Sequence, residues 1–62
     1  MVSNRVMEVI QYYMDNEIRE ELHRKYAPCS NDYFLKKYCE KDTDFASILF
    51  EEFNINVDDL EA

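Results

Sequence analysis

The sequence predicts a small all-α domain of three helices followed by a short acidic C-terminal turn, and three features lead to this prediction. The 62 residues contain no glycine and one proline, which excludes glycine-dependent hairpin turns and phosphate-binding loops. Apolar residues recur at intervals of three and four, the spacing of a helix face. Five tyrosines and four phenylalanines supply apolar bulk for a small core and argue against disorder.

The first predicted helix covers residues 4–26. Ser3 or Asn4 can cap its start with a side-chain oxygen. Pro28 ends it, because the residue before a proline is driven out of helical geometry. The apolar stripe drifts around the cylinder halfway along, so either the two halves of one helix pack on different neighbours or the helix breaks near 15–16, where an aspartate could cap a second helix. We expect the continuous helix.

The second predicted helix covers residues 31–41, and Ser30 or Asn31 can cap it. Its charged residues fall on one side and its apolar residues on the other, which is typical of a helix packed on a core. The apolar side consists of Phe34, Leu35, Tyr38 and Cys39.

The third predicted helix covers residues 43–53, with Asp42 or Thr43 as its cap. Asn54 can end it by adopting the left-handed conformation. Residues 53–57 also alternate between apolar and polar, as a strand does. Because a single strand would have no partner within this chain, we expect a turn there.

We expect one core that unites apolar residues from all three helices. Its members are Ile10, Tyr13, Met14, Phe34, Tyr38, Phe45, Leu49 and Phe53.

Charge is distributed unevenly along the chain. Residues 1–41 contain all seven basic residues and seven of the fourteen acidic ones, so this part is formally neutral. Residues 42–62 contain the other seven acids and no base, and they therefore carry the whole net charge of −7.

No catalytic or metal-binding pattern is present in the sequence. His23, Cys29 and Cys39 are the only soft ligands, and their spacing does not match a zinc site. A cysteine–histidine nucleophile would also need a third orienting group. Residues 42–44 lack the glycine and the glutamate that complete a calcium loop. We therefore expect no enzyme, no cofactor and no metal, and we expect two free thiols, although one disulfide between them remains geometrically possible.

The chain contains no run of about 18 apolar residues and no pattern of a secretory signal. We therefore expect a cytoplasmic protein without a membrane segment.

Residues 31–41 and 43–53 match a helix-turn-helix in length. The second helix would enter the DNA groove, yet its exposed positions are Asp44, Glu51 and Glu52. Because DNA binding depends on neutralising phosphates with lysine and arginine, direct nucleic-acid binding through this helix is disfavoured.

The acidic last third of the chain either keeps an aromatic-rich protein in solution or imitates a phosphate backbone for a basic partner protein. In size and charge the chain is similar to very small acidic helical inhibitors from phages and mobile elements, although no motif matches residue by residue. We expect a protein–protein interaction module that acts as such an inhibitor and DNA mimic. The apolar arc of residues 43–53 spans about 200°, wider than one buried face needs, so part of it should remain exposed beside the acids. The expected partner-binding residues are Asp44, Ile48, Phe50, Glu51, Glu52, Asp58 and Asp59.

Two alternatives remain open. One is a small nucleic-acid-associated regulator that uses the basic surface between Arg19 and Lys41. The other is a structural subunit of a homodimer.

Overall fold

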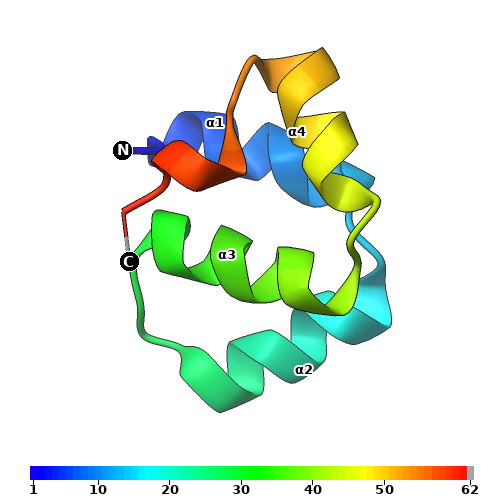
Figure 1. The fold of residues 1–62 in the computed structure, drawn as a ribbon. Coiled ribbons are helices and arrows are strands. Elements are labelled where there is room, and N and C mark those ends of the chain that lie inside the picture. The colour runs from blue at the N-terminus through cyan, green and yellow to red at the C-terminus, as the bar shows by residue number, and fades with distance from the viewer. Residues whose placement is uncertain (62) are drawn as a thin grey trace.

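The computed structural model describes residues 1–61, and within them the chain is all-helical, as predicted. The elements in order are α1 (Asn4–Ile10), the 3-10 turn η1 (Gln11–Tyr13), α2 (Asn16–Tyr26), α3 (Asn31–Lys41), α4 (Phe45–Phe53) and the 3-10 turn η2 (Val57–Asp59). Helix α3 lies in the middle, with α2 along one side and α1, α4 and η2 across the other (Figure 1).

The prediction of three helices was wrong, because the expected helix over 4–26 is two helices. The chain is extended at Met14 and Asp15, and the Asp15 carboxylate accepts a hydrogen bond of 3.2 Å from the Ile18 N–H at the start of α2. The break therefore lies near residues 15–16, where the alternative interpretation of the sequence placed it. Its physical reason is the drifting apolar stripe, since two separate helices bury both Ile10 and Leu22 almost completely.

Helices α1 and α3 begin at the predicted serine caps. The Ser3 hydroxyl oxygen accepts from the Val6 N–H at 3.2 Å, and the Ser30 oxygen accepts from the Tyr33 N–H at 3.1 Å. Helix α3 covers the predicted range 31–41. Local capping chemistry was therefore sufficient to place these two starts.

Helix α4 begins at Phe45, two residues later than predicted, and neither expected cap acts through its side chain. The Phe45 N–H donates to the Asp42 carbonyl at 3.1 Å, and the Ala46 N–H donates to the Thr43 carbonyl at 3.4 Å. Backbone carbonyls of a turn therefore take the place of a side-chain cap. The Asp42 carboxylate instead accepts from the Tyr38 hydroxyl at 3.3 Å.

The end of α4 follows the prediction. Asn54 has a φ of 54° and lies in the left-handed region, and its N–H donates to the Phe50 carbonyl at 3.1 Å. The chain then turns back, and Ile55 packs on the core. The strand-like alternation of residues 53–57 corresponds to the end of α4 and the start of η2.

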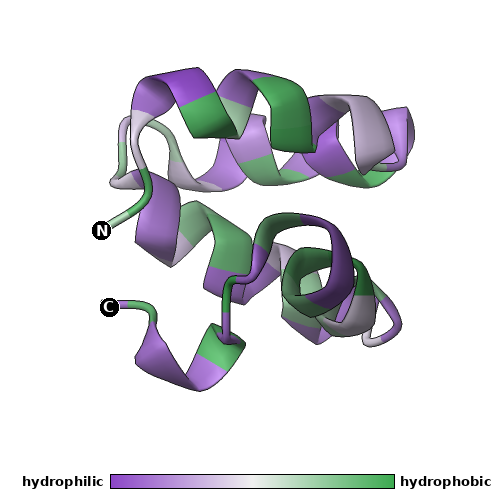
Figure 2. Ribbon diagram, turned by 90° about the horizontal axis from the view of Figure 1, so that it is seen from above, coloured by the Kyte–Doolittle hydropathy of each residue, from purple (hydrophilic) through white to green (hydrophobic). Residues whose placement is uncertain are grey.

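The core fills the space around α3, and most of the expected residues belong to it. Its members are Met7, Ile10, Met14, Leu22, Phe34, Leu35, Tyr38, Phe45, Leu49 and Leu60. Two expectations need correction, because Phe53 is only half-buried and Tyr13 is 45% exposed. The Tyr13 ring lies at the break between α1 and α2 and packs edge-on against Phe53. Hydrophobic and hydrophilic residues alternate along the helices, as expected for helices with one buried side (Figure 2).

Asp32 holds both ends of the chain at the start of α3. Its side chain is 2% exposed and accepts hydrogen bonds from the Val2 N–H at 2.7 Å and the Glu61 N–H at 3.1 Å. The amino group of Met1 lies 3.9 Å from the same carboxylate. The Val2 hydrogen bond stabilises the ionised form and lowers the pKa of Asp32, although burial alone would raise it. We call these contacts of Asp32 with Val2 and Glu61 the clasp. The clasp keeps η2 and the segment after it against the rest of the fold.

Candidate protein-binding site

Helix α4 and η2 together present exposed carboxylates. We call this set the acidic surface, and its members are Asp44, Glu51, Glu52, Asp58 and Asp59. Asp44 and Glu51 lie seven residues apart, which is about two helical turns, so both fall on the same side of α4. Because Asp32 fixes the end of the chain, the carboxylates of η2 have a defined position beside α4.

The structure gathers part of the predicted site around a groove. Phe50 is 59% exposed and borders a groove between α4 and the segment before η2, together with Glu51 and Asp58. This agrees with the expectation that one apolar edge of α4 remains exposed beside acids. The other predicted residues lie outside the groove: Asp44, Glu52 and Asp59 are exposed elsewhere, and Ile48 is half-buried against the core.

The acids of the two parts of the chain differ in their ion pairs. In the first part Glu21 lies 3.5 Å from Lys41, Glu40 lies 3.5 Å from Lys37, and Asp32 faces the amino terminus. No ion pair within residues 1–61 involves a carboxylate from position 42 onward. The carboxylates of the acidic surface therefore have no direct ion-pair partner among the described residues.

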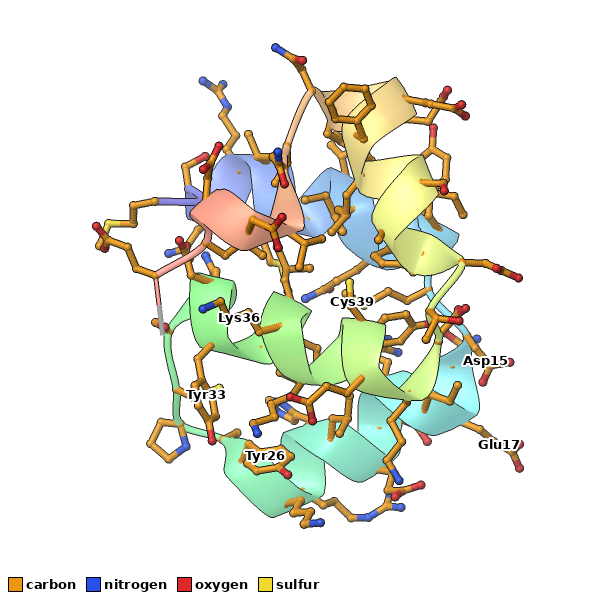
Figure 3. The ribbon with its side chains drawn as sticks, viewed as in Figure 1. Asp15, Glu17, Tyr26, Tyr33, Lys36 and Cys39 are labelled. Carbon is orange, nitrogen blue, oxygen red and sulfur yellow. The ribbon has the colours of Figure 1, made fainter. Side chains whose placement is uncertain are left out.

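The basic surface between Arg19 and Lys41 is satisfied in part by its own neighbours. The rings of Tyr26 and Tyr33 pack edge-on with their centroids 5.7 Å apart (Figure 3). The Lys37 ammonium lies within 6 Å of both ring centroids. The nearby Glu40 carboxylate raises the pKa of Lys37. Lys41 pairs with Glu21. Two of the lysines that could bind a nucleic-acid phosphate, Lys37 and Lys41, therefore already have carboxylate partners.

The residues considered for metal or nucleophilic chemistry do not form a site. His23 and Cys29 are exposed, Cys39 is half-buried, and both thiols are free. Burial raises the pKa of the Cys39 thiol to about 11, with a further contribution from Asp42, so this group stays protonated at neutral pH. Within residues 1–61 no three His, Cys, Asp or Glu side chains come together as metal ligands. The described helices are also too short or too polar to cross a bilayer.

Sequence reasoning missed two features. The clasp at Asp32 has no local signal, because an acid in the first turn of a helix is normally a solvated partner of the helix dipole. The exposure of Val9 and Tyr12 was missed because the first helix was expected to be continuous. The unusual number of apolar residues before Asp15 was the available signal.

The fold and this surface define a small, acidic, all-helical protein. A family model described as anti-CRISPR protein AcrIC5 matches residues 3–43, and the chain therefore belongs to this family. Searches of curated proteins and of solved structures returned no match. Membership in an anti-CRISPR family makes the chain an inhibitor of phage or mobile-element origin, and a role in binding another protein fits it.

Proposed function

We propose that this anti-CRISPR protein inhibits its target by presenting the acidic surface to a basic, nucleic-acid-binding face of a CRISPR-associated protein. The observation that carries this proposal is that no carboxylate from position 42 onward within residues 1–61 has an ion pair, whereas three of the seven acids before them have one. Unpaired carboxylates on a fixed helix repel one another, and a basic partner relieves that repulsion. The same field attracts a protein surface built to bind phosphates.

The exposed ring of Phe50 supports a protein partner over a role in solubility alone. A solubilising surface needs only charge, whereas an aromatic ring beside Glu51 and Asp58 adds apolar area that a partner can cover. Aromatic anchors surrounded by polar groups are typical centres of binding energy. The site of action for such an inhibitor is the cytoplasm, where CRISPR effector proteins meet DNA.

The test compares two double charge reversals of equal size. Glu51→Lys with Asp58→Lys changes the acidic surface, and Glu17→Lys with Glu20→Lys changes exposed positions of α2 by the same charge. We expect the first variant to lose at least about 10-fold in association rate with a CRISPR effector complex that the wild type inhibits, and to restore interference against a target plasmid. The second variant should inhibit almost as the wild type does.

Two results would contradict the proposal. One is equal loss of inhibition in both double variants, since a surface-specific effect requires a difference between them. The other is full inhibition by the variant with Glu51→Lys and Asp58→Lys. Salt-dependent binding of the wild-type protein alone to duplex DNA would instead favour the basic surface.

A further inference from the structure

The segment before the break between α1 and α2 exposes apolar side chains to an unusual degree. Tyr12 is 89% exposed, Val9 49%, Tyr13 45% and Val6 38%. We call these four residues the α1 apolar surface. Among residues 1–61, the only other large hydrophobic side chains as exposed are Met1 and Phe50. Clustered exposed apolar area of this kind marks a contact surface more often than scattered single residues do.

The helix that carries this surface is apolar on two sides. Met7, Ile10 and Met14 point into the core. Val6, Val9 and Tyr13 follow the same spacing of three and four on the adjoining flank of the segment, about 100° around the helix axis, where an ordinary surface helix has polar residues. The core accounts for the first stripe. The second is covered only in part, by the Phe53 ring against Tyr13, and its three side chains remain 38–49% exposed.

The α1 apolar surface adjoins α4. The ring of Tyr13 packs against the ring of Phe53 with centroids 5.3 Å apart. Val6 and Phe53 also border one hollow near the start of the chain. Glu52 is exposed and directly precedes Phe53, so one carboxylate of the acidic surface lies one residue from the ring that Tyr13 contacts.

The charge of the neighbouring helix decides between the possible occupants. A second copy of this chain would bring another α4 toward Glu52, and both helices carry carboxylates without ion pairs among residues 1–61. Like charges brought together at an interface are costly. A protein surface with an apolar or aromatic centre and a lysine- and arginine-rich border meets both the apolar side chains and the acids.

We propose that the α1 apolar surface packs against such an apolar patch on the same partner protein that receives the acidic surface. This inference rests on the proposed function and adds a division of roles. The acidic surface accelerates association over a distance, while the α1 apolar surface slows dissociation through short-range contacts that salt does not screen. All four of its residues lie within the span that matches the anti-CRISPR family model.

The experiment measures association and dissociation rates with a CRISPR effector complex that the wild type inhibits, at several salt concentrations. The variant Val9→Ser with Tyr12→Ala should dissociate at least about 10-fold faster with an unchanged salt dependence of association, because buried aromatic contacts dominate interfaces. The variant Glu51→Lys with Asp58→Lys should instead associate more slowly and with a weaker salt dependence. Tyr12→Ala alone serves if the double variant melts at a lower temperature, since this ring is almost fully exposed.

Dissociation of both α1 variants at the wild-type rate overturns the inference. So does a wild-type homodimer in sedimentation that these substitutions convert to monomers, because the surface would then be covered by a second copy. The proposed function fails separately: if the charge reversals have no effect while Val9→Ser with Tyr12→Ala accelerates dissociation, the acidic surface is not the contact and the α1 contact stands.

Discussion

Replacing Asp32 tests whether the clasp between the two chain ends stabilises the fold. Asp32→Ala leaves the Val2 and Glu61 N–H groups without their carboxylate acceptor. Hydrogen bonds to charged groups contribute about 1.5–3 kcal/mol each, and water that enters at the chain ends offsets part of that loss. We therefore expect a loss of about 2–4 kcal/mol. A chain of this length has a total stability of about 3–9 kcal/mol, so the substitution removes a large share.

The same clasp predicts a dependence on pH. Because the pKa of Asp32 is lowered in the folded state, its contribution is present above the unfolded value of about 3.9 and is lost as the pH falls through the folded value. Asp32→Asn keeps the shape but cannot ionise, and its amide NH₂ would face one of the two N–H donors. The stability difference between wild type and Asp32→Asn should therefore shrink below about pH 4.

Urea denaturation between pH 7 and pH 2, followed by circular dichroism, measures both effects. Asp44→Asn is the control, since this exposed carboxylate caps no helix through its side chain. A loss of about 3 kcal/mol corresponds to a decrease in melting temperature of more than about 10 °C. Equal unfolding midpoints for Asp32→Ala and Asp44→Asn would refute the stabilising role of Asp32, as would a stability difference between wild type and Asp32→Asn that is constant over this pH range.

Three further predictions concern the core, the thiols and the end of α4. Leu49→Ala, at a fully buried position, should cost about 2–5 kcal/mol in chemical denaturation, and an unchanged midpoint would show that Leu49 is not in the core. A thiol reagent should modify Cys29 faster than Cys39 in the folded protein, because Cys39 is half-buried with a pKa of about 11; equal rates that are slow only in the folded state would contradict this order. Asn54→Ala should destabilise by about 1 kcal/mol relative to Asn54→Gly, because a β-carbon disfavours the left-handed conformation, and equal stabilities would argue against the φ of 54°.

Several structural elements were predictable because their causes are local. The serine caps at Ser3 and Ser30, the bounds of α3 and the left-handed Asn54 each depend on groups within a few residues of one another. The concentration of negative charge after residue 41 is also a property of the sequence alone. Together these features were enough to predict an all-helical fold and a protein-binding role.

The start of α4 could not be predicted from local capping chemistry alone. Asp42 and Thr43 both have suitable cap chemistry, yet the turn uses their backbone carbonyls, and the Asp42 side chain meets the Tyr38 hydroxyl. The packing of α3 against α4 selects between these competing local hydrogen bonds.

The sequence by itself determined that the chain is helical, where α1 and α3 are capped, and which part of the chain carries the net charge, because these depend on neighbouring residues. Only the tertiary structure decided that the first helix breaks at Asp15, that Asp32 joins the two chain ends, and that Tyr13 packs on Phe53 while Tyr12 stays exposed. These features depend on contacts between residues about 20 to 30 positions apart, such as the 2.6 Å hydrogen bond from the Asp15 N–H to the Tyr38 hydroxyl. A local pattern cannot specify them, because the free energy that selects them comes from burial and hydrogen bonding between distant segments.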